Sequence, residues 1–311
     1  VDGMSNFGFS LVQTPTMQFA TGELTMADSN MSFYPEGLPA NRWRLFSIPG
    51  IIDSNEIKPN DLEDGHVFYD WDPVAESWFK PDSIVIGRAY WFKHKYNEPV
   101  IFSNKDTTGY SVPLEPYEVK LHQGANMVGS PFPFPVRAEW NEGVSQPYKY
   151  GSDLKEGWAD TNVFEPWAGY AVQSTSDSGK ITFYPIQDTT TAARTANSGW
   201  RLNLDLSSNS SFDRTSSIGR CDACEENVDM NDMLLLPSLT QRVYISLDIS
   251  DDGQFDHSKD LRSTSEFNGI WNMRVNRPNA EGSLTLKGAY DNDKPNDLVL
   301  MIVNVSTREV L

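Results

Sequence analysis

The residues best suited by type and spacing to bind a ligand lie in one acidic loop, Asp248-Ile-Ser-Asp-Asp-Gly-Gln-Phe-Asp256. The oxygen-bearing side chains at positions 1, 3, 5 and 9 of this loop are Asp248, Ser250, Asp252 and Asp256. With Gly253 at position 6, this is the spacing with which a calcium loop wraps its ion. Position 12, where a bidentate Glu is expected, is Lys259, and Asp260 follows one residue late. The pattern predicts a calcium site that includes Asp260, and an acidic hairpin turn is the alternative.

A second chemical feature is the pair Cys221 and Cys224, the only two cysteines of the chain. Four acidic residues follow closely: Glu225, Glu226, Asp229 and Asp232. Nearby carboxylates raise the pKa of a thiol, which is the wrong direction for a reactive thiolate. Zinc needs about four ligands and no second Cys or His pair is present. We expect a small-loop disulfide in an extracytoplasmic protein, with free thiols as the alternative. The carboxylates could hold calcium or form a solvated acidic run.

Tryptophans offer a third kind of chemistry, because exposed indole rings stack on sugars. The candidates in segments that resemble loops are Trp71, Trp78, Trp140 and Trp158. The predicted strands carry Trp43, Trp91 and Trp167, which we expect in the core. Catalysis has little support: the four histidines are scattered, and no His-x-x-x-His, Gly-x-Ser-x-Gly or phosphate-loop motif occurs. The carboxylates Asp70 and Asp72 beside Trp71 are the least implausible acid–base pair.

An internal repeat determines how these residues are positioned. Trp43-Arg-Leu-Phe-Ser-Ile-Pro49 corresponds to Ala125-Asn-Met-Val-Gly-Ser-Pro131, at an offset of 82 residues. Tyr90 corresponds to Tyr170 at an offset of 80, and Val100 to Ile181 at 81. Such a repeat indicates a duplicated structural unit. Each copy has about 60–80 residues and is small to bury a core alone, so both copies are expected to form one domain.

The predicted fold is mainly β. Residues 1–40 are an N-terminal segment or the end of a preceding domain, and residues 41–186 are the duplicated β domain, with copies at about 41–105 and 120–186. Residues 187–199 are polar and predict a linker. Residues 200–311 predict an antiparallel β-sandwich, with candidate strands at 200–206, 242–249, 270–276, 283–288 and 297–305. Short helices are predicted at 55–62 and near 136–142.

Composition restricts the partners. The chain has 311 residues and a formal net charge of −18. Acidic charge repels phosphate backbones, so nucleic acid and anionic membranes are poor partners. No apolar run reaches the length of a membrane span. The first residues, Val1-Asp-Gly-Met4, resemble neither a start nor a signal peptide, and the chain stops in a strand-like segment. We therefore expect a piece of a larger protein.

The repeat resembles a module of large secreted surface proteins of Bacteroidetes-like bacteria. Two elements carry the resemblance, Gly124-Ala-Asn-Met-Val-Gly-Ser-Pro-Phe132 and Pro166-Trp-Ala-Gly-Tyr170. Residues 200–311 resemble, more loosely, the β domain that often follows, through Trp200-Arg-Leu202, Asp229-Met-Asn-Asp232, Pro237 and Asp260-Leu-Arg262. Such modules often precede a sorting domain for type IX secretion. Ala125 departs from the family's usual Trp, and the Cys pair is not an expected family feature.

The expected function is a non-enzymatic structural or adhesion module of a larger extracellular or cell-surface protein, stiffened by calcium. One alternative is a carbohydrate-binding module that uses the loop tryptophans. Another is a self-assembling filament subunit in which strand-like terminal segments pair between protomers. The expected partners are other surface proteins, glycans or a second copy of the chain.

Overall fold

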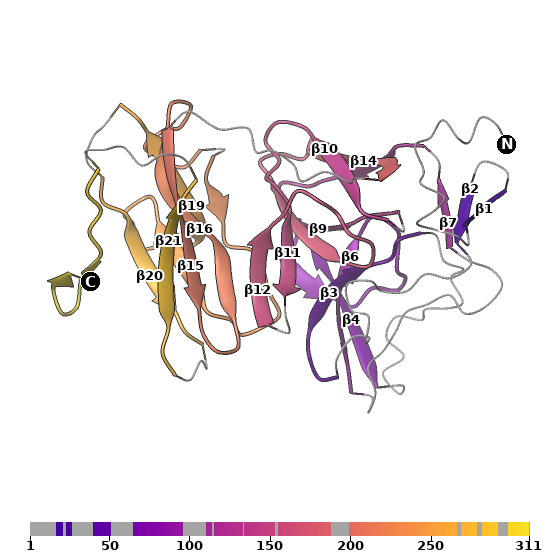
Figure 1. Cartoon of the computed structure of the whole chain (residues 1–311), viewed down its shortest axis with the longest axis horizontal. Coiled ribbons are helices and arrows are strands. Elements are labelled where there is room, and N and C mark those ends of the chain that lie inside the picture. The colour runs from indigo at the N-terminus through magenta and orange to yellow at the C-terminus, as the bar shows by residue number, and fades with distance from the viewer. Residues whose placement is uncertain are drawn as a thin grey trace.

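In a computed structural model, every regular element in the described part of the chain is a β-strand, which confirms the prediction of a mainly β protein. The structure describes residues 17–20, 23–26, 40–50, 65–95, 110–113, 115–132, 134–152, 155–187, 199–229, 231–265, 269–278, 282–291 and 298–310. We call residues 40–187 the N-terminal unit and residues 199–310 the C-terminal unit. Figure 1 shows the N-terminal unit in purple to pink and the C-terminal unit in orange to yellow. The helix predicted at 55–62 and the polar segment 188–198 lie outside the described residues.

Two four-stranded antiparallel sheets form the centre of the N-terminal unit. The first has the order β3 (Arg44–Ser47), β6 (Ala89–His94), β4 (His66–Asp72) and β5 (Ser77–Phe79). The second has the order β9 (Gly124–Gly129), β13 (Gly169–Ser174), β11 (Tyr148–Ser152) and β12 (Lys155–Asp160). Strand for strand, the two orders are the same, and the anchors around Pro49 and Tyr90 belong to the first sheet as those around Pro131 and Tyr170 belong to the second.

The register of the two sheets agrees as well as their order. Ser47 lies opposite Ala89 in the first sheet, and Gly129 lies opposite Gly169 in the second. The offset is 82 residues for the first strand and 80 for its partner, the same values as the sequence anchors. A shift of one residue would turn every side chain to the other face, so matching register means matching buried faces.

One buried tyrosine in each copy makes the same hydrogen bond. The hydroxyl of Tyr90 accepts from the backbone N–H of Val85 at 2.9 Å, and that of Tyr170 accepts from Glu165 at 2.6 Å. Neither tyrosine has an exposed side chain. Burial raises the pKa of both hydroxyls, so both are neutral structural groups.

The copies contact each other reciprocally. The N–H of Ser47 donates to the carbonyl of Trp167 at 3.2 Å, and the N–H of Gly129 donates to the carbonyl of Gly87 at 3.1 Å. Gly87 and Trp167 are again equivalent, and both have a positive φ, 84° and 66°. Reciprocal contacts of this kind define a two-fold, isologous interface, here within one chain.

A third sheet covers one face of the second copy, in the order β10 (Val136–Trp140), β14 (Lys180–Gln187) and β8 (Tyr117–Lys120). Phe183 and Val136 of this sheet pack with Tyr170 and Val172 in one buried cluster. The helix predicted near 136–142 is wrong, because Val136 to Trp140 alternate between buried and exposed positions and pair with β14. A small separate sheet contains β1 (Met17–Ala20), β2 (Glu23–Met26) and β7 (Tyr110–Pro113).

The C-terminal unit contains one seven-stranded sheet. Its strands are β15 (Gly199–Ser207), β16 (Phe212–Cys221), β17 (Met233–Leu234), β18 (Tyr244–Asp248), β19 (His257–Ser263), β20 (Asn272–Asn276) and β21 (Thr285–Tyr290). Their order is β20-β18-β19-β16-β15-β21, with β17 paired to β19. The expectation of a purely antiparallel arrangement is wrong at one pair, because β16 and β19 run parallel. A hairpin of β22 (Val303–Asn304) and β23 (Glu309–Val310) follows.

Hydrophobic side chains from strands that are not neighbours in this sheet pack together in one cluster. Leu204 and Leu206 of β15 pack with Ile245 and Leu247 of β18. These two strands are not neighbours in the sheet, so the sheet must curve to bring them together. Face-to-face contact of this kind buries one apolar face of each strand.

A buried carboxylate joins β16 to β18. Asp213 is fully buried, and its Oδ2 accepts the backbone N–H of Ile245 at 2.9 Å and the hydroxyl of Ser216 at 3.1 Å. Its Oδ1 accepts the N–H and hydroxyl of Thr215, and the Arg242 guanidinium lies 3.7 Å away. A buried charge persists only with such partners, so Asp213 is a structural hub of the C-terminal unit.

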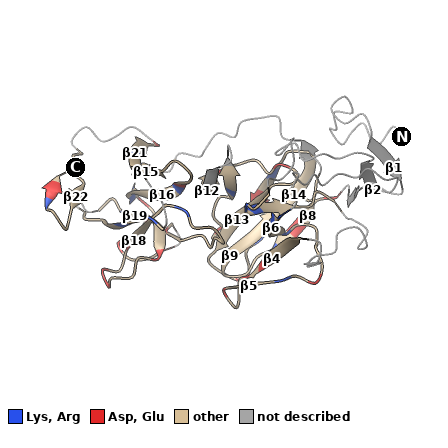
Figure 2. Ribbon diagram, turned by 90° about the horizontal axis from the view of Figure 1, so that it is seen from below, with Lys and Arg blue, Asp and Glu red and all other residues tan. Residues whose placement is uncertain are grey.

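Figure 2 shows acidic side chains in red and basic side chains in blue in both units, on strands as well as in turns. Within strands, Asp213 and Arg220 lie on β16, and Asp260 and Arg262 lie on β19. Within the described residues, no helix has the length and apolar character needed to cross a bilayer.

Candidate functional site

The two units meet through a shared aromatic core. Leu236, from the C-terminal unit, is 4% exposed and lies in one cluster with Tyr150 and Trp158 of the N-terminal unit. The Trp158 ring is fully buried, 4.9 Å from Tyr150 and 6.2 Å from Trp91 between ring centroids. Each large aromatic ring buries a large apolar area, so this contact is a hydrophobic core and not a loose interdomain surface.

Polar contacts fix the orientation of the junction. The Gln173 amide donates to the carbonyl of Leu234 at 2.7 Å and accepts the N–H of Leu234 at 3.0 Å. The hydroxyls of Tyr150 and Thr240 also share a hydrogen bond. Because both hydrogen-bonding groups of Leu234 are satisfied by one side chain, segment 233–240 is held in a single register against the N-terminal unit.

A cleft of about 1210 Å³ opens beside this junction and is lined by both units. Its N-terminal side includes Trp140, Gln146, Asn162 and Gln173, and its C-terminal side includes Trp200, Arg220, Asp232, His257 and Lys259. Binding sites are commonly found where two domains meet, in concave surfaces with a few polar groups. This cleft is therefore the candidate binding site of the chain.

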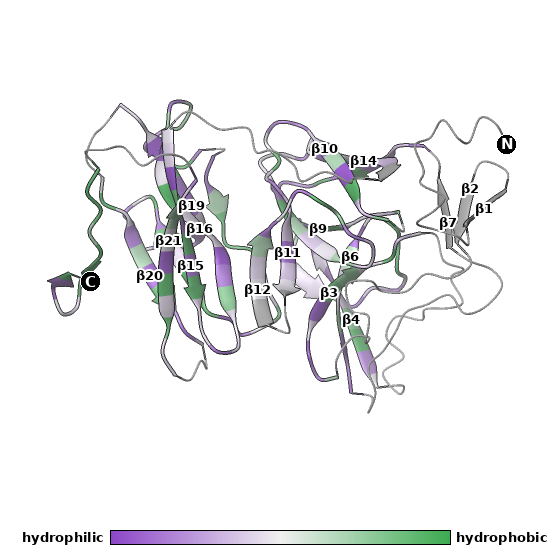
Figure 3. Cartoon of the chain, viewed as in Figure 1, coloured by the Kyte–Doolittle hydropathy of each residue, from purple (hydrophilic) through white to green (hydrophobic). Residues whose placement is uncertain are grey.

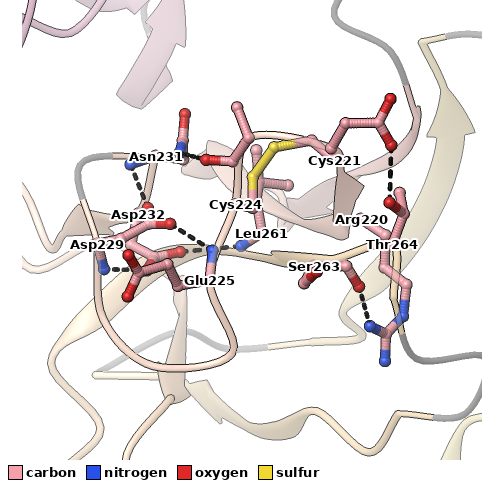
Figure 4. Close-up of a disulfide and its surroundings, with 12 residues drawn as sticks. Arg220, Cys221, Cys224, Glu225, Asp229, Asn231, Asp232, Leu261, Ser263 and Thr264 are labelled. Atoms are coloured by element: carbon pink, nitrogen blue, oxygen red, sulfur yellow. Dashed lines mark hydrogen bonds between the residues drawn. A yellow bond between two sulfur atoms is a disulfide. The ribbon is translucent and has the colours of Figure 1, made fainter.

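The disulfide loop forms part of the cleft wall (Figure 4). Cys221 and Cys224 are disulfide-bonded, with 5.3 Å between their Cα atoms. Both cysteines are buried, and Leu261 packs with them. The disulfide closes a tight loop directly after β16, which ends at Cys221, and the acidic segment 225–232 follows.

Backbone N–H groups of the loop and of β19 occupy the carboxylates of Asp229 and Asp232. Asp229 accepts the N–H of Glu225 at 2.6 Å and the N–H of Asn231 at 2.5 Å. Asp232 accepts the N–H of Asp229 at 2.9 Å and that of Leu261 at 2.9 Å. Backbone donors at these distances organise the turn, so the cluster acts as a structural clasp in this conformation.

Among the titratable groups that line the cleft, Asp232 has the largest shift in pKa. Burial raises its pKa to about 7, and the negative charges of Asp229 and Asp260 add to this effect. The two backbone N–H donors act in the opposite direction. Asp232 therefore changes its charge near neutral pH on the wall of the cleft.

The structure separates the members of the predicted calcium loop. Asp248 is 4% exposed, and its Oδ2 accepts the N–H of Gly253 at 2.9 Å, whereas its Oδ1 is buried without a hydrogen bond to any described residue. Asp256 contacts the His257 ring at 2.6 Å, and Asp260 lies on β19, paired with Arg262 at 2.9 Å. Asp252 caps the turn at Gln254, and Ser250 lies exposed in the same loop. The described residues hold no cluster of three or more His, Cys, Asp or Glu side chains placed as metal ligands.

The four tryptophans predicted to bind sugar occupy three different environments. The rings of Trp71 and Trp78 contact each other at a tilt of 59° with 4.7 Å between centroids, and the Trp71 indole donates to the carbonyl of Ala125. Both rings pack against the shared core. The expectation of an exposed ring at Trp158 is wrong, because that ring is fully buried. Trp140 is the one member that lines the cleft.

The carboxylate pair beside Trp71 is structural. Asp70 is 3% exposed and binds the Arg88 guanidinium at 2.6 Å. Burial raises the pKa of Asp70, whereas backbone hydrogen bonds from Ala75 and Val74 lower that of Asp72. Asp72 caps the turn between β4 and β5, so its oxygens also have structural partners.

Sequence reasoning did not identify several cleft residues, including Gln146, Asn162, Gln173 and Trp200. No motif links them, because they come from separate strands and loops of the two units. One sequence feature could have indicated the junction: segment 233–240, Met-Leu-Leu-Leu-Pro-Ser-Leu-Thr, is an apolar run between two loops. Such a run is expected to be covered by another part of the protein.

Comparisons of the chain with known protein families, with curated proteins and with solved structures found no match.

Proposed function

We propose that the chain is a non-enzymatic structural or adhesion module of a larger secreted cell-surface protein. The observation that carries the proposal is the aromatic core at the junction, where Leu236 packs with Tyr150 and Trp158. A spacer or adhesion module must hold its parts at a fixed angle under load. A junction packed like a protein interior supplies that stiffness, because dense packing transmits strain.

Further features support a surface location. The Cys221–Cys224 disulfide suits an oxidising compartment. The net charge of −18 keeps an exposed protein soluble and disfavours binding to nucleic acid. Calcium at the Asp248 loop would add stiffness, and the buried, unpartnered Oδ1 of Asp248 is the atom that favours it.

Immunolabelling of intact source cells tests the location. Antibodies raised against the chain should label intact cells as strongly as permeabilised ones. Labelling that appears only after permeabilisation would contradict the proposal. A broad hydrolase screen of the purified chain tests the other half: it should show no turnover, and reproducible turnover would overturn the non-enzymatic assignment.

A second candidate function is glycan binding in the cleft. It is favoured by Trp140, which lines the cleft together with the amide side chains of Gln146 and Asn162. Indole faces and amides are suitable partners for the faces and hydroxyls of sugars. A glycan array should show binding that is lost in Trp140→Ala and kept in Trp78→Phe, which changes a ring of the shared core. A blank array for the parent chain would remove this candidate.

A further inference from the structure

Residues 298–305, Leu-Val-Leu-Met-Ile-Val-Asn-Val, form an exposed apolar segment. The exposed fraction is 78% at Val299, 70% at Met301 and 86% at Val305. Figure 3 shows the segment as a green extended trace leading to the C-terminal hairpin. Contiguous exposed apolar residues in a chain with net charge −18 indicate an interaction surface.

The first five residues of this segment, 298–302, make no hydrogen bond with any other described residue. Val303 and Asn304, further along the segment, form β22 and already pair with β23. Beyond them, Asn304 organises a tight hairpin: its carbonyl accepts the N–H of Arg308 at 2.6 Å, and its Oδ1 accepts that of Ser306 at 3.0 Å. An extended run with apolar residues at consecutive positions is apolar on both faces. That pattern is typical of an interior strand covered on both sides.

The sheet of the C-terminal unit offers a matching open edge at β20. Among the described residues, this strand pairs with β18 and with no strand on its other side. Val275 on this strand is 42% exposed, and Ile270, two residues before the strand begins, is 78% exposed. Edge strands with free N–H and C=O groups readily accept an added strand.

Charge favours the same pairing. Residues 298–305 carry no charged side chain, and β20 with the residue after it carries Arg274 and Arg277 but no acidic residue. Docking therefore places no carboxylate against another, although the chain as a whole is strongly acidic. The repulsion between two acidic copies acts over a longer range and is screened by salt.

We propose that residues 298–305 of one copy add as a strand to the β20 edge of a second copy. The proposal goes beyond the proposed function and does not depend on it, because it names a self-association surface outside the cleft. The contact is heterologous: each copy has one segment to give and one edge to receive. Two copies that exchange segments close into a dimer, and copies that do not exchange continue into a longer assembly.

Light scattering coupled to size exclusion tests the proposal on the chain of 311 residues. The apparent mass should rise with protein concentration, and more steeply in high salt. The double variant Val299→Asp/Val303→Asp should weaken association by about tenfold or more, because two buried valines would become two buried carboxylates. Val74→Asp is the matched control: Val74 is 74% exposed but lies at the β4–β5 turn, so this variant should associate like the parent.

Disulfide trapping identifies the pair of surfaces. Val303→Cys and Val275→Cys proteins, mixed and oxidised, should cross-link to each other, whereas Val74→Cys with Val275→Cys should not. The native cysteines are bridged and buried, so they do not interfere. In a chain with both substitutions, a cross-link within one copy at high dilution would show that the segment covers its own edge and would overturn the proposal. A constant monomer mass without intermolecular cross-linking would overturn it too.

Discussion

Leu236→Ala is the substitution that should separate the two units. Leu236 belongs to the C-terminal unit, yet it packs in the cluster of Tyr150 and Trp158 from the N-terminal unit. Replacing a buried Leu by Ala costs about 2–5 kcal/mol, and the cost increases with the cavity that remains. The rings around Leu236 are large and pack against each other, so they cannot collapse into the space. We therefore expect about 3 kcal/mol, lost from the coupling between the units.

The matched control is Leu247→Ala. Leu247 is 1% exposed and lies in the core of the C-terminal unit, away from the junction. Its loss should cost a similar amount, but it leaves the shared core intact. A loss of about 3 kcal/mol lowers the melting temperature by roughly 6–12 °C in a domain of 150–250 residues, so both variants are measurable.

Hydrogen exchange in increasing urea is the assay that distinguishes the two variants, because it reports on each unit separately. In the parent chain, β13 and β15 should lose protection together. Leu247→Ala should lower the midpoint and keep the two coincident, whereas Leu236→Ala should split them into two transitions. Two separate transitions already in the parent, or an unsplit transition in Leu236→Ala, would refute the claim that the shared core couples the units.

Three further predictions concern the junction and the acidic loops. Gly157→Ala should split the transitions as Leu236→Ala does, because its Cβ would lie 2.1 Å from the Phe212 carbonyl oxygen; Gly288→Ala, which meets only the end of a Leu202 side chain at 3.0 Å, is the control and should stay coupled. Asp232 has a pKa of about 7 in the folded chain against 3.8 as its ordinary value, so the folded state holds the extra proton between those values and stability should fall by up to about 4 kcal/mol as pH rises from 4 to 7. Urea titrations at a series of pH values give the free energy of unfolding against pH. This free energy should depend less on pH in Asp232→Asn than in the parent, and an equal pH dependence would contradict the assignment. Millimolar calcium should raise the melting temperature of the parent and not of Asp248→Asn; identical melts in calcium and in chelator would remove the calcium site.

Much of the N-terminal unit could be predicted from sequence because equivalent residues of the two copies recur at nearly constant offsets. The offsets of 82 and 80 residues are the same offsets that relate Ser47 to Gly129 and Ala89 to Gly169 across the two sheets. Apolar residues at consecutive positions in β3 and β13 predict strands buried on both faces, as observed. Four of the predicted strands in the C-terminal unit correspond to β15, β18, β20 and β21.

Two of the strands that sequence reasoning missed, β16 and β19, bury polar side chains. In β16, the side chains of Asp213, Thr215, Ser216 and Ser217 are all at most 5% exposed. Hydrophobic periodicity cannot detect such a strand, because its burial depends on hydrogen bonds to Asp213 and not on apolar side chains. The error at Trp158 has a related cause. Lys155, Glu156 and Asp160 surround it in sequence, so the local pattern resembles a loop. The ring is buried by residues distant in sequence, Trp91 of the first copy and Leu236 of the C-terminal unit among them.

The asymmetry between the two copies follows from the same junction. By the offset of 82, Trp43 in the first copy corresponds to Ala125 in the second, so a large ring in one copy is matched by a small side chain in the other. The carbonyl of Ala125 accepts the indole N–H of Trp71 at 2.8 Å, a contact that joins the first copy to the second. Two identical copies would present two equivalent faces, but only one C-terminal unit packs there. The divergence in the tryptophan-bearing segments therefore breaks the internal symmetry, so that a single C-terminal unit docks in one orientation.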